Sequence, residues 1–221
     1  MHKMKPCAYC GLTDHPREKG HVIPDCIYPS DTKPDVQRRT VPECSECKKI
    51  WQDAENQFRN VLVIAGTPNK AVMEQWEGPI KRSFKMPSGK KWAKALVNQM
   101  VALKNYKDPI YKIYPANDPN VMLVIRKIIR GLCHYHKIAT AISDKRVWAD
   151  ILRYPIPAYL KENMKWFSLG QDFFDYAYEI TNDEDLKIHS SWYLRFYEKR
   201  EFVGFVSMSK DVNSLNSYFI L

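Results

Sequence analysis

The stretch CAYCGLTDHPREKGHVIP, from Cys7 to Pro24, and its counterpart CSECKKIWQDAENQFR, from Cys44 to Arg59, decide how this chain folds. Each stretch carries two cysteines separated by two residues. This gap lets both sulfur atoms of a pair reach one metal ion from a single tight turn, and two such pairs complete the tetrahedral site of a structural zinc ion. The sequence therefore predicts zinc bound by Cys7, Cys10, Cys44 and Cys47.

The segment between and after the cysteine pairs predicts a β-hairpin and a helix. HVIPDCIYP (His21–Pro29) is an apolar patch that indicates a short strand ended by its prolines, and RRTVP (Arg38–Pro42) predicts the returning strand. After Cys47, apolar residues recur at steps of three and four as far as Leu62, which is typical of an amphipathic helix. Zinc ties these elements into a compact ββα unit over residues 1–66, where the polar sequence supplies little core of its own.

The remainder, residues 67–221, predicts an α+β companion domain. Helical patterns cover about 70–155, most strongly at Pro119–His136, and a further short helix is expected from Lys145 to Arg153. Apolar and polar residues then alternate, which is typical of an antiparallel β-meander over about 171–221. The predicted fold class is α+β, with a small zinc-stabilised ββα module followed by a helical and antiparallel-β companion domain.

The composition indicates which class of partner the chain binds and in which compartment it is found. The net charge of +9 favours a polyanionic partner, most commonly nucleic acid, with an acidic membrane surface or simple solubility as alternatives. The sequence has neither an apolar run long enough to span a bilayer nor an apolar signal-peptide core at its start, so we expect a cytoplasmic protein. In a reducing compartment the paired cysteines are expected to bind metal and not to form disulfides.

The order of these motifs resembles the HNH endonuclease family, in the branch whose histidine lies in a Glu-His-Val-Ile-Pro type of motif. The resemblance covers residues 5–62. It implies a zinc-knuckle, ββα-metal nuclease that hydrolyses phosphodiester bonds in DNA, and by analogy a component of bacterial or phage defence. The matching pieces are Cys7–Gly11, His21–Pro24, Thr40–Cys47, and Glu55 with Phe58-Arg59.

The resemblance also implies roles for single residues. His21 would accept a proton from water, and a divalent cation, Mg²⁺ or Mn²⁺, would neutralise the leaving 3′ oxygen. The chain departs from the family pattern at Gly20 and Lys48, which stand where metal ligands are usual. Glu55 is the strongest replacement and a catalytic candidate, because the branch usually carries an acid there. The candidate ligands for the catalytic cation are Glu55, Asp53 and Glu18.

Basic residues indicate where the DNA backbone would bind. The stretch Lys81–Lys94 holds six Lys or Arg residues and no acid, and such a run can displace counterions from nucleic acid, although a charge run is also typical of a solvated surface. Trp92 can stack on a base or pack inward. The candidate nucleic-acid contacts are Arg38, Arg39, Lys48, Lys49, Arg59, Lys81, Arg82, Lys90, Lys91 and Trp92.

Two further functions stay open. Because Gly20 and Lys48 replace usual ligands, the chain is alternatively a catalytically degenerate HNH zinc module that binds nucleic acid or a partner protein. It is also consistent with an HNH subunit that is active only beside a partner such as an ATPase or a sensor subunit.

Overall fold

In the computed structural model, the chain begins with a β-hairpin. The structure describes residues 5–14, 16–29, 32, 38–64, 68–102, 112–115, 118–170, 173–185 and 187–209, and only the backbone of Trp92, Ala102, Lys112 and Ile113. Strand β1 (Arg17–His21) pairs antiparallel with β2 (Thr40–Cys44), and helix α1 (Ser45–Ile64) follows β2 directly. The predicted mixed α+β class and the helix after Cys47 are confirmed.

The first strand lies earlier than the sequence pattern indicated. It was expected to begin at His21, whereas β1 ends there. The apolar Val22 and Ile23 are fully buried beyond the strand, next to a 3₁₀ turn, η1 (Asp25–Ile27). Their apolar character therefore reflects burial in the core and not strand pairing, and Pro24, which has no N–H to donate, separates them from η1.

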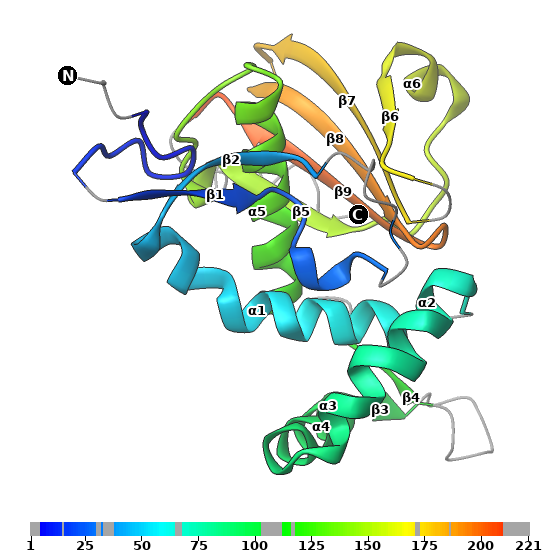
Figure 1. The fold of residues 1–221 in the computed structure, drawn as a ribbon. Helices are drawn as coiled ribbons and strands as arrows, with labels where there is room; N and C mark the ends of the chain where they lie inside the picture. The colour runs from blue at the N-terminus through cyan, green and yellow to red at the C-terminus, as the bar shows by residue number, and fades with distance from the viewer. Residues whose placement is uncertain are drawn as a thin grey trace.

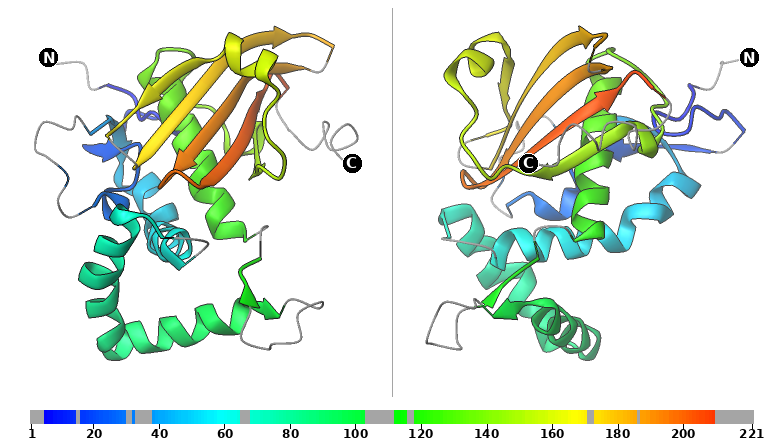
Figure 2. Two further views of the ribbon diagram at one scale, coloured as in Figure 1. Left: turned by 90° about the vertical axis from the view of Figure 1, so that its right-hand side faces the viewer. Right: turned by 180° about the vertical axis from the view of Figure 1, so that it is seen from behind.

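A helical arm, residues 70–99, projects from the end of α1 (Figures 1 and 2). It turns through a π-helical segment that contains Pro79, whose ring and missing N–H disturb regular α-helical bonding. A two-stranded ladder of β3 (Val101–Ala102) and β4 (Lys112–Ile113) follows. The elements of the arm are α2 (Lys70–Gln75), η2 (Trp76–Ile80), α3 (Lys81–Lys85) and α4 (Pro87–Gln99).

The second half is built mainly from one long helix, α5, and one antiparallel sheet. Helix α5 (Pro119–Tyr135) is capped by Asp118, whose side chain accepts hydrogen bonds from the backbone N–H groups of Asn120 and Val121, and it confirms the predicted helix. The sheet has the strand order β5-β9-β8-β7-β6. The remaining elements are η3 (Asp144–Arg146), β5 (Val147–Ile151), α6 (Ala158–Asn163), β6 (Lys165–Ser168), β7 (Phe174–Asp183), β8 (Ile188–Phe196) and β9 (Arg200–Ser207).

The short helix expected from Lys145 to Arg153 is wrong. Only η3, the turn Asp144–Arg146, is helical, and VWADI forms the edge strand β5, which pairs with β9 from Val147↔Val206 onward. The ladder hydrogen bonds to β9 outweigh a local pattern too short to specify a helix. The predicted meander is confirmed in β7, β8 and β9, and its expected final segment, residues 216–221, lies outside the described residues.

One hydrophobic core joins the hairpin unit to the sheet. Helix α5 lies between them (Figure 1), and Phe58 of α1 packs edge to face on Phe196 of β8, with ring centroids 5.2 Å apart. The sequence pattern predicted a boundary at residue 66, but buried side chains from both sides of it belong to one core. Within the described residues, none of the helices is both long enough and apolar enough to cross a membrane.

Candidate functional site

The four paired cysteines come together at the base of the hairpin. Their sulfur atoms lie within 4.8 Å of one another, and the Sγ atoms of Cys10 and Cys44 are 3.8 Å apart. The backbone N–H of Cys47 donates to Cys44 Sγ at 3.4 Å, as suits a thiolate ligand in a tight turn. This geometry can hold one metal ion such as zinc.

The electrostatics of the thiols fit a bound cation. Burial disfavours ionisation of Cys7, but backbone hydrogen bonds from Cys10, Tyr9 and Cys44 outweigh it and lower the pKa of Cys7 to about 7. Burial and then the neighbouring sulfurs raise the pKa of Cys47. A cation among these groups offsets the repulsion between thiolates, and soft sulfur ligands select zinc over Mg²⁺.

His21 lies at the end of β1, opposite Thr40, and is partly exposed. The backbone after it turns into the core at Val22, so the end of the strand is fixed. Its carbonyl oxygen accepts a hydrogen bond of 2.6 Å from Nζ of Lys127 on α5. The histidine therefore combines a partly accessible side chain with an anchored backbone.

Gly20, the residue before His21, lies directly beside an acid of the neighbouring strand. A Cβ atom at Gly20 would lie 2.2 Å from Oε2 of Glu43, so no larger residue fits while Glu43 keeps this position. Glu43 is only 3% exposed and accepts a hydrogen bond from Trp51 Nε1 at 2.8 Å. Burial raises the pKa of the Glu43 carboxyl, against the opposing charge of Lys127. Strand β2 thus places a buried carboxyl group beside Gly20, the residue before His21.

The three predicted cation ligands are not brought together. Glu18 pairs with Lys48 at 2.6 Å on the surface, Glu55 pairs with Lys127 at 2.6 Å, and Asp53 is exposed on α1. Across the part of the chain that the structure describes, the four cysteines are the only group of three or more His, Cys, Asp or Glu residues able to hold a metal ion. These residues therefore do not fit the predicted Mg²⁺ or Mn²⁺ site.

The arginines of the hairpin unit are engaged with neighbouring groups. Arg38 forms an ion pair with Asp25 and lies 4.9 Å from the ring centre of Tyr28. Arg39 donates to the hydroxyl of Tyr135 at 2.5 Å and lies over its ring. In the same unit, Arg59 donates to Asn60 Oδ1 at 3.0 Å. Arg38 keeps a side chain that is 43% exposed, so it is the most accessible of the three for a phosphate.

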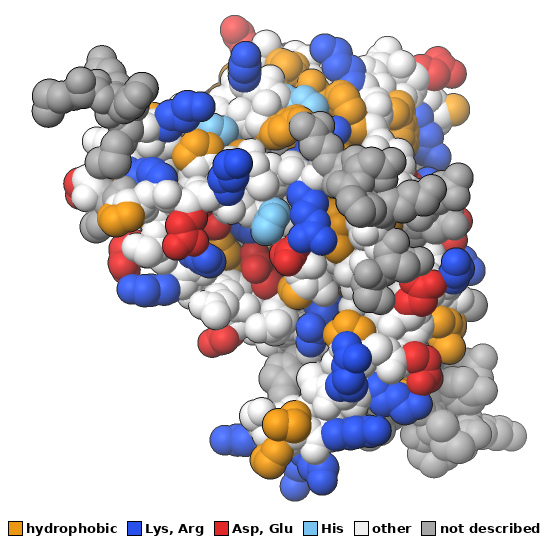
Figure 3. Space-filling model, viewed as in Figure 1, with side chains coloured by type: hydrophobic (Ala, Val, Ile, Leu, Met, Phe, Trp, Pro, Cys, Tyr) orange, Lys and Arg blue, Asp and Glu red, His pale blue; other side chains and the backbone are white. Residues whose placement is uncertain are grey.

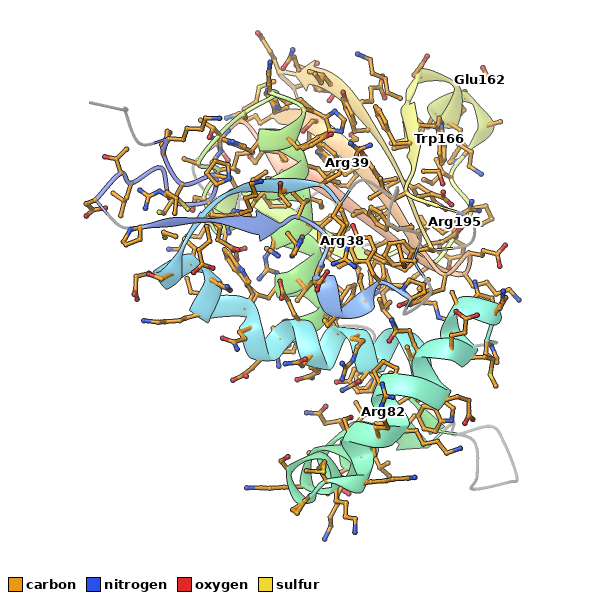
Figure 4. The ribbon with its side chains drawn as sticks, viewed as in Figure 1. Arg38, Arg39, Arg82, Glu162, Trp166 and Arg195 are labelled. Carbon is orange, nitrogen blue, oxygen red and sulfur yellow. The ribbon has the colours of Figure 1, made fainter. Side chains whose placement is uncertain are left out.

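The predicted lysine contacts divide between two places. Lys48 pairs with Glu18, and Lys49 pairs with Glu46 at 3.0 Å, both on the surface of α1. The others belong to the arm, where Lys and Arg side chains gather over α3 and α4 (Figure 3), and Arg82 lies well away from Arg38 and Arg39 (Figure 4). The side chain of Trp92 lies outside the described residues. The exposed basic residues of α3 and α4 are Lys81, Arg82, Lys85, Lys90, Lys91 and Lys94.

Two residues of the site escaped the sequence analysis. Lys127 is a lysine among the apolar residues Val124 and Ile128 of α5, and a charge on an otherwise apolar helix face is a signal of a buried partner. Glu43 stands two residues after Val41 in a strand, and hence on the same face, which would have placed it near Gly20 once the register was known.

Comparisons of the chain with protein-family models, with curated proteins and with solved structures found no match.

Proposed function

We propose that this protein is an endonuclease of the HNH type, stabilised by a structural metal ion, that hydrolyses phosphodiester bonds in DNA with His21 as the general base. One observation supports this proposal most directly. The two residues assigned to the chemistry by resemblance, His21 on β1 and Glu55 on α1, are contacted by the same side chain, because Nζ of Lys127 lies 2.6 Å from an oxygen of each.

The proposed step uses groups that the chain itself provides. The partly exposed imidazole of His21 accepts a proton from a water molecule as the water oxygen attacks phosphorus. The bond from phosphorus to the 3′ oxygen breaks, and that oxygen takes a proton from solvent, leaving a 3′ hydroxyl and a 5′ phosphate. The four-cysteine site would hold zinc as a closed structural ion, which fixes the hairpin and takes no part in this step.

The helical arm would hold the DNA. The basic residues of α3 and α4 are exposed and lie on one projecting part of the molecule (Figure 3), and Lys81 among them pairs with Glu77 at 2.7 Å. Exposed lysines on such a surface bind phosphates without reading bases, because counterion release does not depend on sequence. Cleavage by this protein is therefore expected to show little sequence preference and to weaken with salt.

The experiment is plasmid cleavage by the full zinc-loaded chain, compared with His21→Ala. We expect a loss of about 10²- to 10⁴-fold in the cleavage rate, the usual contribution of a general base. His134→Ala is the matched control, because His134 hydrogen-bonds to Thr140 Oγ1 on another part of the molecule and should leave the rate unchanged. To test cleavage without Mg²⁺, the ion is left out of the buffer. A chelator is not used, because it would also remove zinc from the four-cysteine site.

Equal cleavage by the wild type and His21→Ala would overturn the catalytic proposal. The second candidate function is a non-catalytic module that binds nucleic acid or a partner protein. The ion pair between Glu55 and Lys127 favours it, because a Glu55 carboxylate held by the lysine does not bind a divalent ion. It predicts DNA binding without cleavage in both proteins. Cleavage that is restored only by an added ATPase or sensor subunit would instead support the partner-dependent form.

A further inference from the structure

Lys127 is a charged side chain in a place where charge is costly. Its side chain is only 2% exposed, although it lies at the contact between the hairpin unit and α5. Nζ donates to the His21 carbonyl oxygen and to Glu55 Oε1, each at 2.6 Å, and lies 5.8 Å from the ring centre of Trp51. A buried ammonium persists only when fixed oxygens compensate its lost hydration, so these contacts hold Lys127 in one position.

The surroundings of this ammonium are those of a bound cation. It donates one hydrogen bond to a carbonyl oxygen at the end of β1 and one to a carboxylate oxygen of α1, so it links the strand to the helix. The Glu43 carboxyl group, which lies where a side chain at Gly20 would project, faces the same interior and interacts with the charge of Lys127. Carboxylate and carbonyl oxygens are the ligands that Mg²⁺ and Mn²⁺ prefer.

We propose that the ammonium group of Lys127 is the resident cation of this site, occupying the position between strand and helix that a divalent ion would otherwise take. This assignment explains why Glu55 does not serve as a ligand for a divalent ion: its carboxylate already has a cation. Lys127 is a positioning residue, because its buried ammonium holds the His21 backbone and does not reach solvent. The catalytic meaning of this role rests on the proposed endonuclease function.

The test is Mn²⁺ binding to the zinc-loaded full chain, followed by electron paramagnetic resonance. The wild type should show no Mn²⁺ site that depends on Glu55. Lys127→Ala removes the ammonium and leaves space among the oxygens of Glu55, Glu43 and His21, so it should gain one Mn²⁺ per chain, bound at least about tenfold tighter than by the wild type. Its midpoint of thermal unfolding should rise with added Mn²⁺, whereas that of the wild type should not.

Two controls separate this site from other carboxylates. Lys48→Ala breaks an ion pair of the same 2.6 Å length on the surface and should gain no Mn²⁺ site. The double variant Lys127→Ala with Glu55→Gln should lose the gained site. Lys127→Gln, which keeps a donor for the His21 carbonyl, replaces the alanine variant if that protein does not fold.

Either of two results overturns the proposal. One is a wild-type Mn²⁺ site that Glu55→Gln abolishes, since the lysine would then give way to the metal. The other is a folded Lys127→Ala or Lys127→Gln protein with no new site. Failure of the endonuclease proposal is seen separately, as cleavage that does not depend on His21, and it leaves the Mn²⁺ result unaffected.

Discussion

Two regions of this molecule use lysine in opposite ways. At the contact of α1 with α5, a single buried lysine, Lys127, is held by oxygens of His21 and Glu55. On the arm, lysines such as Lys90 and Lys91 are exposed on a helix that carries no acid between Pro87 and Gln99. The buried charge fixes a local geometry, while the exposed charges create a field that acts over about a Debye length, or 10 Å at moderate salt.

The difference teaches that residue type alone does not show what a charge does. A lysine in the arm can change with little cost to the fold, because water solvates it before and after the change. A lysine at the centre of the site cannot, because its partners would keep their own charges without compensation. The following predictions test this contrast, from the largest expected effect to the smallest.

The largest effect is expected at the four-cysteine site. Cys44→Ser should lower the free energy of unfolding by about 5 kcal/mol or more, because structural zinc contributes on the order of 10 kcal/mol in small zinc modules. Thermal unfolding with and without added zinc measures it. Cys133→Ala, a buried cysteine of α5 outside the cluster, should cost only about 1 kcal/mol. Equal losses would show that the cluster holds no structural metal.

The next effect contrasts two ion pairs of equal length. Lys127→Met keeps the side-chain volume but removes the charge, and it should cost about 3 kcal/mol of unfolding free energy, because Glu55, whose side chain is only 21% exposed, loses its partner. Lys48→Met, in the exposed pair with Glu18, should cost about 1 kcal/mol or less. Denaturant unfolding of both variants checks this. Similar small losses would mean that water reaches Glu55 and solvates it.

On the arm the effect should fall on binding and not on the fold. Lys90→Glu with Lys91→Glu should weaken DNA binding about tenfold and reduce the slope of log affinity against log salt by about 2, one unit for each lost phosphate contact. The unfolding free energy should change by less than about 0.5 kcal/mol. The matched control is Lys145→Glu with Lys187→Glu, which changes the charge equally at exposed sites near the sheet. Equal weakening by both pairs would assign the effect to net charge alone.

The smallest effect concerns pH at the far end of α5. Burial, with the charges of Arg39 and Lys165, lowers the pKa of His136 to about 4. The unfolded chain, with an ordinary histidine pKa of about 6.5, binds a proton first as pH falls, so stability should decline between about pH 6.5 and 4. His136→Phe should make this decline shallower in denaturant unfolding series. An unchanged slope would show that other groups cause the decline.

The sequence predicted the elements with strong local patterns. Helix α5 and the alternating strands β7 to β9 show hydrophobic periods of about four and of two residues, which a short stretch of sequence is enough to detect. The metal site was predictable from the spacing within its two cysteine pairs. Strand β5 was missed, because a five-residue strand is decided by its partner β9, which is more than fifty residues away.

The chemical site was predictable only in part for the same reason. His21 and the cysteines stand in motifs, so their positions could be proposed from the sequence. The contact between Lys127 and Glu55 spans 72 residues and depends on how α5 packs against α1, which no local pattern specifies. Glu18, Asp53 and Glu55 were therefore assigned to a metal, whereas Glu55 is paired with a lysine from the second half of the chain.

The fit between Gly20 and Glu43 has an evolutionary consequence. Because a Cβ atom at position 20 would lie 2.2 Å from the Glu43 carboxylate, the two positions are sterically coupled and cannot drift independently. A relative with an acid at position 20 is expected to carry a small residue at position 43, and the reverse. In an alignment, this pair should appear as covariation, and a search pattern that accepts the acid at either position would find relatives that a fixed Glu-His motif overlooks.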